Sequence, residues 1–163
     1  MNGDSKKRPI EERIAALMGK SAYRDLRDGV AMGGTLQFTD QDVAAAIGAA
    51  AHLGCRVGVM ALETYYGSTL LHQVALLREW EESERKIGDT REQIVLTRFG
   101  GALAIQQMAG GKVASSAYSE YAYLIFSRRE KLEARVRAAG AWLEEQRFNA
   151  LRKVKTQLFQ EAA

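Results

Sequence analysis

The chain has 163 residues, of which 47% are hydrophobic, so it is long enough to bury one ordinary core. Its single cysteine, Cys55, excludes an internal disulfide, and the opening MNGDSKKRPIEE lacks the apolar stretch of a signal peptide, so we expect a cytoplasmic protein. The formal charge of +3 is unevenly spread: residues 1–35 hold 7 cations and 5 anions, residues 36–111 hold 6 and 9, and residues 112–163 hold 10 and 6. Basic ends favour a phosphate partner, but so small an asymmetry decides nothing alone.

The N-terminal part of the chain predicts a short helix followed by a connector. The only proline, Pro9, stands at a first helical position, and apolar residues recur at helical spacing over 10–18 before a glycine follows. Residues 21–38 combine a brief charged helical piece with several glycines. We therefore expect residues 1–38 to form a basic arm and residues 39–163 to form the main helical domain.

A helix of small residues is predicted next. Thr39 and Asp42 have the spacing of a capping box, and the helix that they begin runs to Gly54. Because small side chains allow close backbone approach, we expect this helix at the centre of the domain. The window 43–62 is the most apolar of the chain, but a histidine, an arginine and many small residues make it a poor bilayer span, so no membrane is expected.

Three further helices are predicted in the middle of the chain. The segment RVGVMALETYYG, residues 56–67, alternates enough for a strand, but a lone strand has no partner, so a helix is expected. Ser68 is placed to cap a helix over 70–86. Asp89 and the glutamate three residues later give a capping-box spacing for a helix that ends near Gly110.

The C-terminal segment predicts one long helix, residues 116–161, which begins at Ser115 or Ser116 and meets no breaker except Gly140. At 100° per residue its apolar positions share a stripe about 60° wide, with a period near eleven residues that predicts nearly straight or slightly right-handed packing. The stripe comprises Tyr121, Ile125, Leu132, Val136, Ala139, Leu143, Ala150 and Val154. A helix roughly 65 Å long exceeds the width of such a domain, so it should project, bend near Gly140 or pack against a second copy.

Together these segments predict an all-α protein, a compact helical bundle of about five helices with a long C-terminal helix. One flank of that long helix carries cations without acids. We call this flank the cationic ridge; it consists of Arg128, Lys131, Arg135, Ala138, Trp142, Gln146, Asn149 and Lys153. Such a surface suits phosphate. The ordinary interpretation is a solvated flank whose long stems cover the core edge and whose tryptophan packs on a neighbouring helix. Away from the ridge, Glu133 is spaced to pair with Arg137.

Two pairs of predicted helices have the order of a helix-turn-helix. The pair joined at Gly54 offers a single arginine in its second helix and would read a DNA groove weakly. The pair joined by residues 110–114 would place Lys112, Ser115 and Ser116 at a helix N-terminus, where hydroxyl and backbone N–H groups suit phosphate and base edges. A plain helical hairpin is the alternative.

Catalytic and metal chemistry lack their residues in this sequence. His52 and Cys55 stand one turn apart, but Gly54 separates them and only carboxylates remain to complete a zinc site. The glycine-lysine pairs lack the first glycine of a P-loop, and no nucleophile elbow or triad is present. Adjacent glutamates lie in charged helical stretches typical of solvated faces. We therefore predict no enzymatic activity, no metal and no cofactor.

The predicted function is that of a small nucleic-acid-associated regulatory protein, by analogy with basic helical transcription regulators of phage or plasmid type. Its expected partners are nucleic acid or a nucleic-acid-bound protein complex, and a homo-oligomer is expected. The residues predicted to bind nucleic acid are Lys112, Ser115, Ser116, Arg128, Lys131, Arg135, Trp142 and Lys153. The alternative is a non-enzymatic protein–protein adaptor or inhibitor that uses the long helix as a docking or dimerisation strut.

Overall fold

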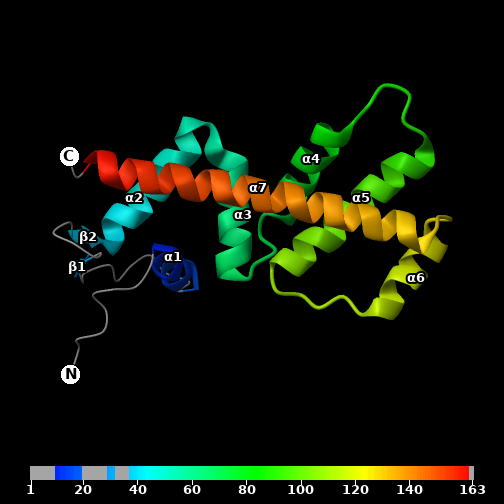
Figure 1. Cartoon of the computed structure of the whole chain (residues 1–163), viewed down its shortest axis with the longest axis horizontal. Helices are drawn as coiled ribbons and strands as arrows, with labels where there is room; N and C mark the ends of the chain where they lie inside the picture. Colours follow the sequence, from blue (N-terminus) through cyan, green and yellow to red (C-terminus); the bar gives the residue numbers. More distant parts are fainter. Residues whose placement is uncertain (1–9, 20–28, 32–36, 162–163) are drawn as a thin grey trace. The chain divides into compact units, whose positions relative to one another are not determined.

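The structure is a computed structural model that describes residues 10–19, 29–31 and 37–161. The helices are α1 (Ile10–Gly19), α2 (Asp40–Ala50), α3 (Arg56–Gly67), α4 (Gln73–Glu84), α5 (Arg91–Met108), α6 (Ser115–Leu124) and α7 (Arg129–Glu161), shown in Figure 1. A π-helical segment, η2 (Ala51–Cys55), joins α2 to α3, and β1 (Gly29–Ala31) pairs antiparallel with β2 (Gln37–Thr39). The predicted all-α class with a long C-terminal helix is confirmed, while the described ranges hold this short ladder and more helices than the five or so that were predicted.

The chain divides into two units, which are described separately. Unit 1 comprises residues 1–67 and 146–163, and unit 2 comprises residues 68–145. The C-terminal half of α7 therefore belongs to unit 1 and its N-terminal half to unit 2. The predicted division at residue 38 does not coincide with either boundary, and much of the predicted arm lies outside the described residues, so that division stays a prediction.

The core of unit 1 collects apolar side chains from α1, α2, α3 and the C-terminal half of α7. It comprises Ile10, Ile14, Leu17, Val43, Ala46, Ile47, Ala50, Val59, Leu62, Ala150, Leu151, Val154 and Leu158. Gly58 allows α3 and α7 to approach, because a Cβ there would meet the carbonyl oxygen of Gln146 at 2.5 Å. The helix of small residues is buried on one face only, since Ala45 and Gly48 of α2 are exposed; its predicted central position is therefore wrong.

Both ends of the α2 segment follow the sequence signals. Thr39 N donates to Asp42 Oδ2 at 2.6 Å, and Asp42 N donates to Thr39 Oγ1 at 3.1 Å, so the predicted capping box is present. Gly54 adopts a left-handed φ of 89°, as expected for a glycine stop. By length and composition Asp40–Gly67 qualifies as a membrane span, with 39% of its apolar window buried in the structure, although the backbone at Leu53 and Gly54 is not helical.

Unit 2 is organised around α5, which packs against α4 and the N-terminal half of α7. Trp80 is buried, and its Nε1 donates to the Thr97 carbonyl oxygen at 2.9 Å. A Cβ at Gly100 would meet the Arg135 Cβ at 2.7 Å, so this glycine sets the approach of α5 to α7. The capping box of α5 lies one residue later than predicted, at Thr90 and Gln93.

Two predicted helix starts are wrong. Ser68 does not cap α4, because this helix begins at Gln73 and Ser68 itself has a φ of 46°. Asp89 is not the cap of α5, because its carboxylate accepts instead from Lys86 N at 2.8 Å and closes the preceding turn. Before α4 it is Thr69 whose Oγ1 accepts from Leu71 N, at 3.2 Å, so in both places a polar side chain satisfies a local turn rather than the helix that follows it.

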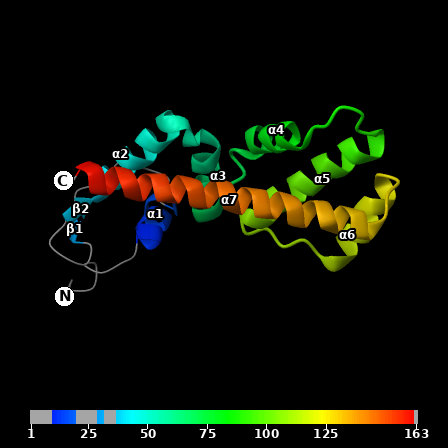
Figure 2. The ribbon, with the colours of Figure 1, turned by 45° about the horizontal axis from the view of Figure 1, so that its top comes forward.

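The predicted helix 116–161 is in fact two helices. Ser127 N donates to the Ala122 carbonyl oxygen at 2.9 Å and Phe126 N to that of Tyr123 at 3.1 Å, which is the closure of a Schellman motif. Phe126 occupies the left-handed position of that motif, with a φ of 55°. The chain therefore turns after α6, and α6 lies beside the first turns of α7 (Figures 1 and 2).

The predicted buried stripe is confirmed only for its residues in α7. Leu132, Val136, Ala139, Leu143, Ala150 and Val154 are all buried, as predicted. Tyr121 belongs to α6 and Ile125 to the turn, so the eleven-residue pattern does not extend through them on one helix. The helix α7 runs through Gly140 without a break. Projection, a bend near Gly140 and packing against a second copy all stay predictions.

Candidate functional site

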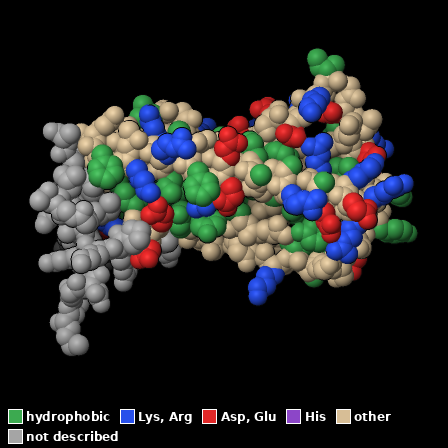
Figure 3. Space-filling view, viewed as in Figure 1, with side chains coloured by type: hydrophobic (Ala, Val, Ile, Leu, Met, Phe, Trp, Pro, Cys, Tyr) green, Lys and Arg blue, Asp and Glu red, His purple; other side chains and the backbone are tan. Residues whose placement is uncertain are grey.

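Two of the three cations that the cationic ridge has in unit 2 are paired with acids of neighbouring helices. Lys131 Nζ lies 2.8 Å from Glu92 Oε1 of α5, and Arg135 Nη1 lies 2.7 Å from Glu84 Oε2 of α4. The Trp142 ring packs on that of Trp80, with centroids 5.7 Å apart, as the ordinary interpretation predicted. The ridge is therefore free of acids only along its own helix. Basic and acidic side chains are interspersed over much of the face of the molecule shown in Figure 3.

The ion pair between Lys131 and Glu92 affects the pKa of the glutamate. Hydrogen bonds from Lys131 Nζ and from Ser127 Oγ, the latter at 2.7 Å, hold the pKa of Glu92 below its ordinary range. Both donors approach the same carboxylate oxygen. Because the carboxylate is solvent-exposed, this pair contributes little to stability. It nevertheless engages Lys131, which from the sequence alone would be counted as a cation free to bind phosphate.

The remaining predicted residues divide between the two units. Arg128, Lys112 and Ser116 are exposed in unit 2, and Lys153 is half-buried in unit 1. Two of them, Lys112 and Ser116, flank the N-terminus of α6, which is capped by Ala114 without a side-chain hydrogen bond. The predicted cap at Ser115 or Ser116 is therefore wrong.

Arg129 organises the α6–α7 hairpin, and the sequence did not single it out. Its Nη2 donates to Ser115 Oγ at 2.9 Å, its Nη1 to Ser119 Oγ at 3.3 Å, and its Nε to Glu133 Oε1 at 2.7 Å. The guanidinium thus joins the first turns of the two helices. Since Glu133 is engaged in this way, its predicted pairing with Arg137 is wrong, and Arg137 is exposed without an acidic partner among the described residues.

A groove of about 470 Å³ lies between α6, α7 and the end of α5. We call it the α6–α7 groove. Its lining residues are Gln107, Val113, Ser115, Tyr118, Arg129, Glu133, Val136, Arg137 and Gly140. The Tyr118 hydroxyl accepts from Gln107 Nε2 at 2.6 Å, and a Cβ built on Gly140 would meet nothing within 4 Å. Of its lining residues one is acidic, and that acid is already bonded to Arg129, so the groove favours an anion.

A second groove, of about 410 Å³, lies on the opposite side of the buried stripe. This α5–α7 groove is lined by Glu92, Gln93, Leu96, Lys131, Ala134, Arg135 and Ala138. Both of its cations are ion-paired, as described above. Its charges are therefore balanced within the protein.

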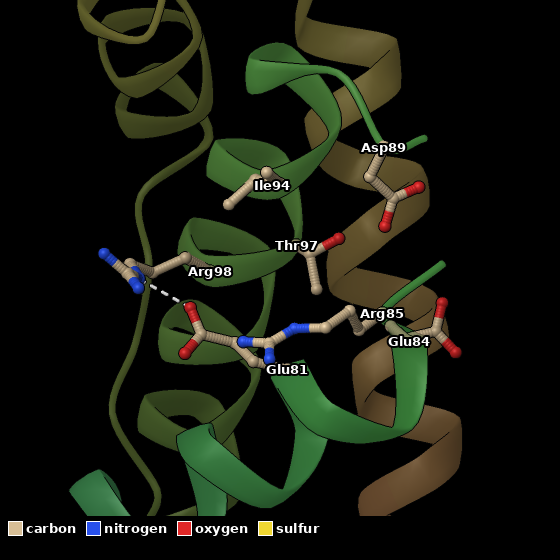
Figure 4. Close-up of a pocket in the computed structure, with 7 residues that line it drawn as sticks. All are labelled: Glu81, Glu84, Arg85, Asp89, Ile94, Thr97 and Arg98. Atoms are coloured by element: carbon tan, nitrogen blue, oxygen red, sulfur yellow. Dashed lines mark hydrogen bonds and ion pairs between the residues drawn. The ribbon is translucent and has the colours of Figure 1, made fainter. Parts of the chain in front are cut away.

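A smaller cavity, of about 50 Å³, lies between α4 and the start of α5 (Figure 4). Its walls include an ion pair of 2.5 Å between Arg98 Nε and Glu81 Oε1, and hydrogen bonding to Glu81 raises the pKa of Arg98. The space is sufficient for one or a few water molecules rather than for an organic ligand.

Unit 1 contains a buried arginine packed among aromatic rings. The Arg147 guanidinium carbon lies 4.1 Å from the centroid of the Tyr65 ring, and its Nη1 donates to the Tyr66 hydroxyl at 3.2 Å. Burial raises the pKa of Tyr66. Every group in this cluster has a partner inside unit 1, so we assign it to packing.

In the described ranges no group of three or more His, Cys, Asp or Glu side chains is arranged to hold a metal ion. Comparison of the chain with protein-family models, with curated proteins and with solved structures finds no match. Functional inference therefore rests on the geometry of the α6–α7 groove.

Proposed function

We propose that the chain is a nucleic-acid-associated regulatory protein that contacts phosphates through the α6–α7 groove and the adjoining connector before α6. The observation that carries the proposal is Arg137, an exposed cation on the wall of a groove whose one acid is already paired with Arg129. Exposed Lys112 extends the positive charge into the connector. Unpaired cations attract phosphate without first giving up an internal carboxylate.

The same argument removes two predicted residues from the proposed interface. Lys131 and Arg135 would have to exchange glutamates at 2.8 and 2.7 Å for phosphate oxygens, which offsets much of the gain. Trp142 packs on Trp80 and is not free to stack on a base. The proposed interface therefore keeps Lys112, Ser115 and Ser116 from the predicted set and adds Arg137. Arg129 is itself paired with Glu133 and holds Ser115 in place, and Arg128 and Lys153 do not line the groove.

A salt-titrated binding assay tests this proposal. Arg137→Gln with Lys112→Gln should weaken binding to a mixed-sequence duplex or single strand. It should also reduce the slope of log affinity against log salt by about 0.7–0.9 for each lost phosphate contact. The matched control is Arg78→Gln with Arg152→Gln, which removes two exposed cations outside the groove. Equal losses from both pairs, or no binding of any nucleic acid at low salt, would contradict the proposal.

The adaptor function remains a second proposal, and the turn between α6 and α7 favours it. Phe126 is 95% exposed and Tyr123 is 81% exposed, with exposed Leu124 between them. Apolar side chains gathered in this way are typical of protein-binding surfaces. The test is the mass in solution: self-association through this turn should be lost in Tyr123→Ser with Phe126→Ser. A mass that these substitutions leave unchanged contradicts self-association there.

A further inference from the structure

The walls of the α6–α7 groove differ in chemistry. Arg137 brings positive charge that no acid of the described residues neutralises, and Ser115 brings a hydroxyl, whereas half-buried Val113 brings apolar surface beside the bare backbone of Gly140. The backbone of a duplex presents phosphate and sugar but keeps its bases stacked inside. A nucleotide of a single strand presents a phosphate and an unstacked base face together, which is the combination that these walls match.

The concave shape of the site also disfavours recognition of bases in the grooves of a duplex. Proteins that read duplex DNA insert a protruding helix or ribbon into the major groove. Here Ser115 and Tyr118 of α6 line a concavity instead, and each is bonded to a lining residue, Arg129 and Gln107 respectively. The groove has a volume of about 470 Å³ and is open to solvent, so it has room for a small organic group lying against one face.

Gly140 supplies the third observation. It lies inside α7, where glycine is a poor helix former, and a Cβ there would meet no protein atom within 4 Å. Packing within the protein therefore does not require glycine at this position. The open space above the helix backbone allows a flat group to lie directly against it.

From these observations we infer that the α6–α7 groove binds one nucleotide unit of single-stranded nucleic acid. The phosphate contacts Arg137, and the base lies over Val113 and Gly140. This inference rests on the proposed function and narrows its ligand from nucleic acid in general to the single-stranded form.

The experiment compares fluorescence anisotropy of a labelled twelve-residue single strand, as DNA and as RNA, with that of the blunt duplex of the same sequence, at low salt. The single strand should bind at least about tenfold more tightly than the duplex. Gly140→Leu, which fills the groove, should weaken single-strand binding by about tenfold. Gly48→Leu is the matched control, because Gly48 lies in α2 of unit 1, and a Cβ there also meets nothing within 4 Å. Circular dichroism of both variants establishes that they fold.

The outcomes separate the inference from the function on which it rests. If the duplex binds as tightly as the single strand and Gly140→Leu binds like the parent, the inference is overturned while the proposed function stands. If neither probe binds, both fall. A labelled polyglutamate peptide is the third probe. If it binds more tightly than the single strand and loses affinity in Gly140→Leu, the groove belongs to an acidic protein partner and the inference is overturned.

Discussion

The two grooves that flank α7 in unit 2 are close in volume but differ in how their cations are paired. Each is lined by two cations of the same helix: Lys131 and Arg135 in the α5–α7 groove, Arg129 and Arg137 in the α6–α7 groove. Acids of α4 and α5 pair with both cations in the first groove, whereas Arg137 in the second has no such partner among the described residues. The availability of a cation is therefore decided by the helix opposite it, and a scan along one helix cannot reveal it.

The largest expected effect comes from two glycines, Gly100, which is buried where α5 approaches α7, and Gly140, which lines the α6–α7 groove. Gly100→Ala should lower the free energy of unfolding by about 1–3 kcal/mol, because its Cβ would meet Arg135 Cβ at 2.7 Å and force α5 from α7. Gly140→Ala should instead raise it by up to about 1 kcal/mol through helix propensity alone. Denaturant titration of the two variants measures both changes, and a loss of stability in Gly140→Ala would show that the α6–α7 groove is closed.

Removing the two acids that pair with the cations of the α5–α7 groove is expected to have the next largest effect, on nucleic-acid affinity. Glu84→Gln with Glu92→Gln frees Lys131 and Arg135, so single-strand affinity at low salt should rise several-fold and the salt slope should steepen by up to about 0.7 per freed cation. The control, Glu82→Gln with Glu145→Gln, makes the same change in net charge at two exposed acids. If the control raises affinity equally, total charge rather than pairing governs binding.

A smaller effect is expected from the arginine that joins α6 to α7. Arg129→Gln removes its bonds to Ser115, Ser119 and Glu133 and should cost about 0.5 kcal/mol, since the side chain is 40% exposed. Hydrogen exchange should accelerate at the amides of α6 and not at those of α5. Arg137→Gln is the comparison, because an arginine without an acidic partner should leave these rates unchanged.

The smallest predicted change is a shift in the pKa of one glutamate. Lys131→Gln should raise the pKa of Glu92 toward its ordinary value, as followed by carboxyl NMR shifts against pH. A carboxyl whose folded pKa is lowered stabilises the fold above its unfolded pKa, and this stability is lost as the pH falls through the folded pKa. The Lys131 variant should therefore lose part of this acid dependence. Arg128→Gln should shift the titration less, because Arg128 acts on Glu92 only through its charge.

Much of the fold could be predicted because its signals are local. The apolar spacing after Pro9 gives α1, and the pairing of Thr39 with Asp42 gives the start of α2. The turn after α6 could not be predicted in this way. No glycine or proline marks it, and Phe126 adopts a left-handed conformation that the sequence disfavours by about 1 kcal/mol. Tertiary packing of the two helices must offset that cost.

The candidate site was harder to predict, because its charges are set by contacts between helices. Glu92 lies thirty-nine positions before Lys131 in sequence, and Glu84 lies fifty-one before Arg135, so no local spacing pairs them. Within one helix, Glu133 had two arginines at four-residue spacing, and spacing alone could not choose between them. The hydroxyls of Ser115 and Ser119 hold Arg129 in place and so decide the choice.

The left-handed turn at Phe126 has a practical consequence for following this protein in solution. It offers an almost fully exposed aromatic side chain directly after α6, which is the preferred kind of cleavage site for a chymotrypsin-type protease. Cutting requires the turn to open, so the cleavage rate reports how firmly α6 is held on α7. A ligand seated in the α6–α7 groove should therefore protect the chain from digestion, and its occupancy becomes measurable on an ordinary gel without any label.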